Sequence, residues 1–219
     1  MGLLQGSPGE QILAGSSALR LATAREHESV ERALGLPGAI ESLADYRRWL
    51  SRFFGIYSPL EERLRGFPEW DAWGISIAAS GQSAALRRDL VALGCAIPEI
   101  ELASAGDLPG LHGFAPALGA LYVLEGSKLG GRIMLKDLCG RLGDEIAGAD
   151  AFFRGNGAET MPAWIAFRTA LDRFFVERPD ESAEVVRGAK ETFQAIERWM
   201  AAMASPMARE PSMPRAAAL

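Results

Sequence analysis

The chain of 219 residues has only two cysteines, no excess of positive charge and no long apolar run. Cys95 and Cys139 stand alone and match no zinc or redox spacing, so a reduced, cytoplasmic protein is the simplest interpretation. The net charge of −5 argues against nucleic acid as a main partner, because neutralising phosphates requires a basic surface. No apolar run is long enough to span a bilayer, and the opening residues MGLLQGSPGE lack the features of a secretory signal. We therefore expect neither a nucleic-acid partner nor a membrane partner.

Sustained strand-like alternation is also missing, and the apolar residues recur instead at helical spacing. They make up 48% of the chain, which is ordinary for a globular protein. The pattern predicts helices over 16–35, 42–67, 82–94, 115–142, 162–177 and 182–203. We expect residues 1–16 and 205–219 to be disordered. The predicted fold class is therefore all-α, a single multi-helix bundle over residues 17–204.

The pattern from Ala115 to Leu142 predicts one long helix that is weakened in its middle, because three glycines interrupt its apolar pattern. These are Gly126, Gly130 and Gly131. Each interior glycine costs a helix about 1 kcal/mol relative to alanine. Two explanations are open at this point. Small residues allow two helix backbones to approach closely, or a flat ligand lies against the bare backbone.

The first predicted helix carries one of the two histidines on its apolar stripe, which comprises Leu19, Thr23, His27, Val30 and Leu34. We therefore expect His27 to face the core. Arg20 lies on nearly the same face, and Glu31 follows His27 by one turn, where it can orient the ring. Two roles remain open for His27: a core histidine satisfied by Glu31, or a neutral imidazole that ligates a metal.

Two other metal arrangements are less favoured. A di-iron carboxylate site requires a glutamate three residues before the histidine, and Ala24 occupies that position. The second histidine, His112, adjoins a glycine outside any periodic pattern, so we expect it at the surface.

Two motifs carry a resemblance to a known family. LRLATAREHESVE resembles the proximal-helix signature of haem oxygenases, and LYVLEGSKLGGR resembles their distal-helix signature. The second motif is closer to the bacterial branch associated with phytochromes than to the mammalian enzymes. The helix pattern, including AKETFQAIERW, extends the resemblance from about Ser17 to Met203. The resemblance implies a haem-oxygenase-like bundle with a glycine-kinked distal helix. It also implies oxidative cleavage of haem to biliverdin, CO and ferrous iron, with O₂ and external electrons.

The same resemblance implies partners and binding residues. Haem is both substrate and cofactor, a redox partner or small reductant supplies electrons, and a bilin-accepting phytochrome is a further candidate partner. His27 matches the proximal histidine that ligates haem iron, and Glu31 matches the acidic group that supports it. Arg20 and Arg168 match basic residues that pair with haem propionates. Phe193 matches an aromatic residue on the distal side.

On the distal helix, the resemblance places the backbone of Gly126, Gly130 and Gly131 against the porphyrin. Ser127 stands where the better-known enzymes have an aspartate that organises distal water. Lys128 stands where the bacterial branch usually has a small hydroxyl residue. Because burying a lone ammonium is unfavourable, we expect Lys128 to reach solvent or the carboxylate of the nearby Glu125.

Two other functions remain open. A protein of this fold could bind or carry haem without turnover, or a helical bundle could use the glycines for packing alone. Adding hemin and then a reductant distinguishes the three functions, through a Soret band and through bilin absorbance.

Overall fold

The structure, a computed structural model, describes residues 15–201. Within this range it contains nine α-helices and no strand, so the predicted all-α fold is confirmed. The helices are α1 (Ser16–Ala22), α2 (Ala24–Leu34), α3 (Leu43–Arg65), α4 (Ile77–Ser80), α5 (Ser83–Ala92), α6 (Phe114–Leu142), α7 (Ala151–Arg154), α8 (Thr160–Glu177) and α9 (Ser182–Ala201). Apart from Gly15 and Ser16, the predicted disordered segments 1–16 and 205–219 lie outside the described residues.

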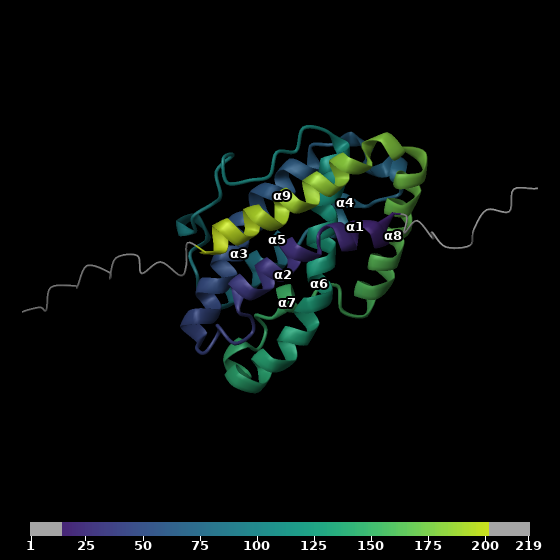
Figure 1. The fold of residues 1–219 in the computed structure, drawn as a ribbon. Helices are drawn as coiled ribbons and strands as arrows, with labels where there is room; N and C mark the ends of the chain where they lie inside the picture. The colour runs from purple at the N-terminus through teal and green to yellow at the C-terminus, as the bar shows by residue number, and fades with distance from the viewer. Residues whose placement is uncertain (1–14, 202–219) are drawn as a thin grey trace, which may run out of the picture.

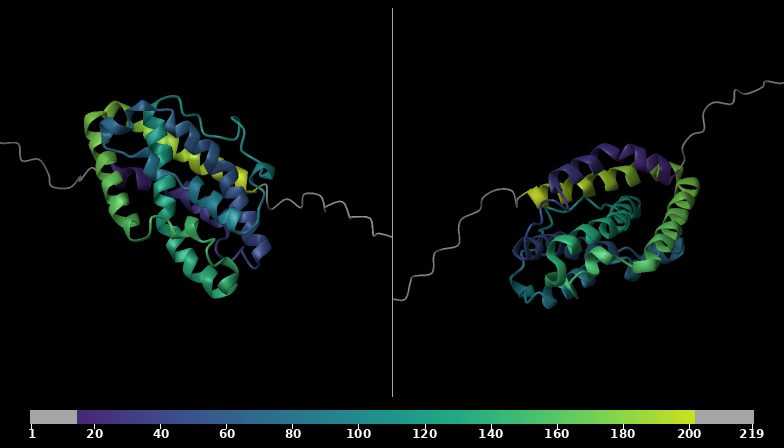
Figure 2. Two further views of the ribbon diagram at one scale, coloured as in Figure 1. Left: turned by 180° about the vertical axis from the view of Figure 1, so that it is seen from behind. Right: turned by 90° about the horizontal axis from the view of Figure 1, so that it is seen from below.

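Helix α6 is the central element of the bundle. It lies between a layer formed by α1, α2 and α9 and a layer formed by α3 and α5, while α8 stands across one end (Figures 1 and 2). Its first twelve residues, 114–125, are all buried, as expected for a helix that is apolar on every side. The helix continues without interruption through its glycines, and its two halves point in different directions (Figure 2).

Close contact between α6 and α9 depends on two glycines that the sequence analysis did not single out. A Cβ atom on Gly119 would overlap the backbone of Val185, and one on Gly188 would overlap the backbone of Pro116. The two helix backbones therefore touch at this crossing, which requires residues without side chains. Helix α9 is held firmly against the central helix.

The first predicted helix is interrupted, which corrects the prediction of one helix over 16–35. It breaks at Thr23, whose hydroxyl donates to the carbonyl of Leu19 at 2.9 Å. Such back-bonding by threonine bends helices. Neither Ser16 nor Ser17 caps the helix, because Ser16 is already its first residue. The predicted end is confirmed, since Gly35 adopts the left-handed conformation with φ of 58°.

A buried carboxylate holds the short helix α7 beside α6. Asp89 of α5 accepts hydrogen bonds from the backbone N–H groups of Ala151 and Phe152, at 2.9 and 2.8 Å. Burial raises the pKa of Asp89, and these two hydrogen bonds oppose that shift. The carboxylate replaces a local cap for α7 and fixes the position of the next residues, including Phe153.

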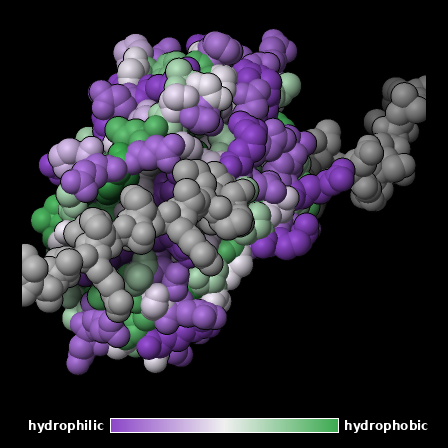
Figure 3. All heavy atoms as spheres, turned by 90° about the vertical axis from the view of Figure 1, so that its left-hand side faces the viewer, coloured by the Kyte–Doolittle hydropathy of each residue, from purple (hydrophilic) through white to green (hydrophobic). Residues whose placement is uncertain are grey.

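The outer surface is mostly hydrophilic on the side shown in Figure 3, with small hydrophobic areas between the polar residues. Scattered apolar exposure of this kind is normal for a globular domain. No helix between residues 15 and 201 is both long enough and apolar enough to cross a bilayer.

Candidate functional site

One face of α6 presents bare backbone. Tyr122, Gly126 and Gly130 follow one another at intervals of four and so share this face, which we call the glycine stripe. Both glycines are half-buried. A Cβ atom on Gly126 would come no closer than 3.8 Å to Trp164, and one on Gly130 no closer than 3.8 Å to Met134. Neither glycine is needed for helix packing, and the stripe leaves room for a ligand to approach the backbone.

Gly131 has a different environment from the other two glycines. It is buried, and a Cβ atom on it would lie 2.9 Å from the carbonyl oxygen of Phe153. This contact allows α7 to pack against α6. The expectation that all three glycines face one ligand is therefore corrected: Gly131 serves packing, whereas Gly126 and Gly130 lie on the open face.

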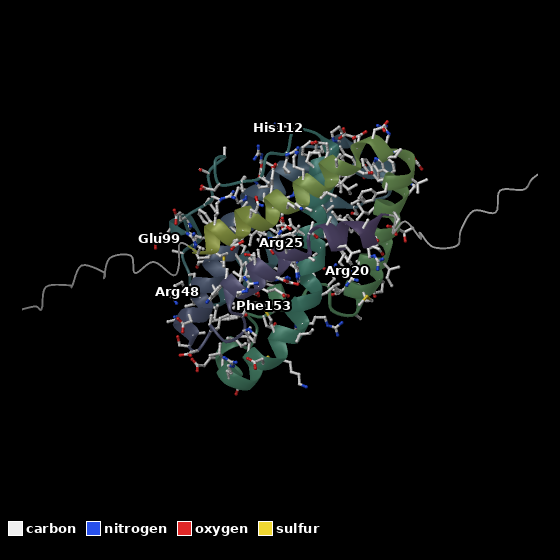
Figure 4. All side chains as sticks on the ribbon, viewed as in Figure 1. Arg20, Arg25, Arg48, Glu99, His112 and Phe153 are labelled. Carbon is white, nitrogen blue, oxygen red and sulfur yellow. The ribbon has the colours of Figure 1, made fainter. Side chains whose placement is uncertain are left out.

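Two arginines from different helices converge at one end of the glycine stripe. Burial raises the pKa of Tyr122, while the charges of Arg20 and Arg168 and a hydrogen bond with Thr23 oppose that shift. Arg20 comes from α1 and Arg168 from α8, and Figure 4 shows Arg20 beside α6 and α8. The Arg168 Nε donates to the Ser16 hydroxyl at 3.0 Å, which fixes its direction. Ser16 and Arg20 lie one turn apart on α1, so this hydrogen bond places Arg168 near Arg20, and the charges of both arginines act on Tyr122.

Tyr122, Thr23 and Trp164 are site residues that sequence reasoning missed. The rings of Trp164 and Tyr122 lie 5.6 Å apart, so an aromatic side chain of α8 borders the glycine stripe. The one available signal was the spacing of Tyr122, four residues before Gly126 and eight before Gly130. Nothing local to α8 indicated which helix Trp164 would face.

His27 is accessible, which corrects the expectation that it faces the core. Its side chain is 55% exposed, and its ring meets Phe193 edge-on with centroids 5.5 Å apart. Glu31 lies one turn away, with its Oε1 at 3.7 Å from His27 Nε2, beyond hydrogen-bond distance. The break at Thr23 and the packing of α2 on α9 leave His27 at the border of the buried face. The imidazole is therefore free to meet a ligand.

Phe193 lies on α9 against His27, whereas the resemblance matches it to an aromatic residue on the distal side. The reason is that α9 packs along both α2 and α6, and this part of α9 faces α2. Phe193 is buried, so it forms an apolar wall beside the imidazole.

The hydroxyl of Ser127 is already engaged. It donates to the carbonyl of Leu124 at 2.8 Å and accepts a hydrogen bond from the Tyr57 hydroxyl at 3.2 Å. Burial raises the pKa of Tyr57 to about 12, so this phenol remains a donor at neutral pH. Tyr57 belongs to the buried face of α3. Its hydroxyl required a partner when buried, but the sequence did not show which one.

Lys128 pairs with Glu125, one of the two partners expected for it. Their Nζ and Oε1 atoms are 2.7 Å apart, and the side chains are 2% and 5% exposed. The alternative of reaching solvent is wrong. Lys128 lies about 200° around the helix from Gly126, because each residue turns the helix by about 100°. It faces Gly155 and leaves the glycine stripe uncovered.

Between residues 15 and 201, no group of three or more histidine, cysteine, aspartate and glutamate side chains is placed to hold a metal ion. His112 is exposed, as expected, and Figure 4 shows it at the upper edge of the molecule, apart from Arg20 and Arg25.

The family model described as Heme oxygenase matches residues 14–202, which covers every helix described above. No curated protein matches the chain.

Proposed function

The chain belongs to the haem oxygenase family, and we propose that it binds haem between α2 and the glycine stripe of α6 and cleaves it oxidatively. The proposed products are biliverdin, CO and ferrous iron. One observation carries the proposal: the bare backbone at Gly126 and Gly130 shares a helix face with Tyr122, and the charges of Arg20 and Arg168, which are linked through Ser16, act on that tyrosine. A helix of a purely structural bundle would have no use for this combination.

The residues present fit the three parts of haem. The flat apolar ring matches the glycine stripe and the neighbouring Trp164 ring. The two propionates match Arg20 and Arg168, because carboxylates leaving water need cationic partners. The iron matches the half-exposed imidazole of His27, a common haem ligand.

When bound, haem supplies the redox chemistry, with O₂ and with electrons from an external donor. The protein supplies orientation and electrostatics. His27 would ligate the iron through one ring nitrogen, and Glu31 lies near enough to hold the other nitrogen through a water or a small shift. Gly126 and Gly130 allow the ring to approach the helix closely, which excludes water from that face.

Ser127 has a limited role in this proposal. Its proton is held by the Leu124 carbonyl, and Tyr57 occupies one of its lone pairs. Ser127 therefore positions water beside the glycine stripe mainly as an acceptor. We propose that backbone groups and ordered water provide the remaining hydrogen bonds on the distal side.

The second candidate function is a haem-binding or haem-carrier protein without turnover. The same engagement of Ser127 favours it, because no acidic side chain stands at this position to organise distal water. Turnover under reducing conditions separates the two candidates.

The resemblance of the distal motif to the phytochrome-associated branch supports further proposals about the electron donor and the acceptor of the product. We propose that a redox partner or small reductant delivers the electrons, and that a bilin-accepting phytochrome receives the product. A cytoplasmic location is supported by Cys95 and Cys139, which are both unpaired thiols.

The test is a hemin titration of the full chain, followed by ascorbate in air. A Soret band that saturates at one equivalent, followed by bilin absorbance, is the expected result. His27→Ala should lose the histidine-ligated ferrous spectrum, whereas His112→Ala, the matched control, should keep it. A Soret band without bilin would favour the carrier, and an unchanged ferrous spectrum in His27→Ala would remove the proximal assignment.

A further inference from the structure

Three residues on one face of α9 make specific side-chain contacts with α2. They are three and four residues apart, which places them on adjacent turns. Each one meets a different residue of α2: Lys190 meets Glu26, Phe193 meets His27, and Glu197 meets Ser29. The contact to His27 is therefore flanked on both sides by a polar contact.

Helix α2 has little apolar anchorage of its own. Of its eleven residues, only Val30 is buried. Apolar burial is the main term that holds most helices in place, so α2 depends unusually on its other contacts. The three contacts with α9 are among them.

The two polar contacts differ in kind. The Ser29 hydroxyl donates to the Glu197 carboxylate at 2.9 Å, a direct charge-assisted hydrogen bond. The Glu26 side chain is only 19% exposed, its Oε1 lies 3.6 Å from the Lys190 Nζ, and its Oε2 is buried with no hydrogen-bond partner in the structure. Lys190 is therefore the main compensation for a carboxylate that is largely removed from water.

We propose that Lys190 and Glu197 are positioning residues, which set the place and tilt of His27 through Glu26 and Ser29. The inference rests on the proposed function, because it concerns how His27 meets haem iron. Without Lys190, the Glu26 carboxylate gains by turning toward water. Since Glu26 and His27 are adjacent on α2, that movement carries the imidazole away from its position against Phe193.

The test uses the full chain loaded with hemin and two measurements: the dissociation constant for hemin, and the iron–histidine stretching band of the ferrous complex in resonance Raman spectra. Lys190→Met should raise the dissociation constant about three- to tenfold, the range for losing a partly exposed charge pair. It should also shift the band. Lys190→Arg, which keeps the charge, should leave both measurements at their wild-type values. Ser29→Ala should shift the band in the same direction as Lys190→Met.

Two controls separate positioning from general stability. Arg178→Met removes the exposed ion pair of Arg178 with Glu181, 2.9 Å apart, and should change neither measurement. The double variant Glu26→Gln, Lys190→Met removes both charges and should recover most of the wild-type band, because no carboxylate is then left without a partner.

The outcomes are distinct. Wild-type protein without a Soret band would overturn the proposed function and this inference with it. Wild-type protein with a histidine-ligated spectrum, together with an unmoved band in Lys190→Met, would overturn the inference alone. Weaker hemin binding with an unmoved band would also overturn it, since Lys190 would then act on stability and not on the position of His27.

Discussion

Lys128→Met should be one of the most damaging single substitutions in α6, although it lies away from the proposed haem face. Lys128 and Glu125 form an ion pair of 2.7 Å between side chains that are 2% and 5% exposed. Methionine fills much of the same volume without a charge. The substitution therefore isolates one effect: a buried carboxylate loses its cation.

The magnitude follows from the burial of both groups. Breaking a buried pair by removing one partner costs about 3–5 kcal/mol, because the remaining charge stays uncompensated. Whole domains have unfolding free energies of about 5–15 kcal/mol, so this loss is a large share. For a chain of this size, about 1 kcal/mol corresponds to about 2–4 °C in Tm. We expect the Tm of Lys128→Met to fall by roughly 6–20 °C.

The decisive comparison is with the double variant Glu125→Gln, Lys128→Met. Replacing both charges of a buried pair is often neutral, so the double variant should regain most of the lost Tm. It should also bind hemin with wild-type affinity, because Lys128 lies on the opposite side of α6 from the glycine stripe and Glu125 is buried in its pair with Lys128. Thermal unfolding by circular dichroism and a hemin titration provide the measurements.

Three results would refute this reasoning. A Tm loss below about 2 °C in Lys128→Met would show that the pair is not buried in solution. A double variant as unstable as the single one would show that lost packing, not the unpaired charge, is responsible. A stable double variant with weak hemin binding would place Lys128 on the haem face after all.

The remaining predictions concern the two kinds of glycine in α6, the charge of Arg20 and the three tyrosines. Gly131→Ala should lower the Tm, since its Cβ would lie 2.9 Å from the Phe153 carbonyl oxygen. Gly130→Val should keep the Tm and exclude hemin, and equal effects of the two substitutions on Tm and hemin binding would contradict separate roles for the two glycines. Arg20→Glu should weaken hemin binding about tenfold, because it reverses a charge beside the propionates, and an unchanged affinity removes Arg20 from the site. All three tyrosines have raised pKa values, and that of Tyr57 is about 12. Phenolate absorbance should therefore appear at higher pH in the folded protein than in the unfolded protein, whose tyrosines titrate near pH 10. The unfolding free energy should then fall as pH rises above about 10, because the unfolded state ionises first; a native transition centred near pH 10 is the contrary result.

Much of the fold could be predicted because helical periodicity is a local property. The pattern over 42–67 predicted α3, and the structure shows that Ser42 caps its start, with its hydroxyl accepting from the Asp45 N–H. The glycines within 115–142 marked α6 as the unusual helix, since their cost in a helix interior is independent of the rest of the fold. The same reasoning missed the break at Thr23, because a side-chain hydrogen bond to Leu19 competes with the regular helix.

The sequence by itself determined which residues share a helix face, because 3.6 residues per turn relate near neighbours in the chain. It thus indicated the stripe through Gly126 and Gly130, and the pairing of His27 with Glu31 one turn later. The family resemblance added Arg20 and Arg168 as two cations that match the basic residues pairing with haem propionates. None of these inferences required knowledge of another helix.

Only the tertiary structure decided what each face meets. It assigned Gly131 to α7 and left Gly130 open, although the two are adjacent in the chain. It placed Phe193 against His27, because α9 lies along α2 as well as α6. It also buried Lys128, whose charge alone would have favoured the surface. These outcomes depend on long-range packing between helices, and local spacing carries no information about which distant segment will cover a given face.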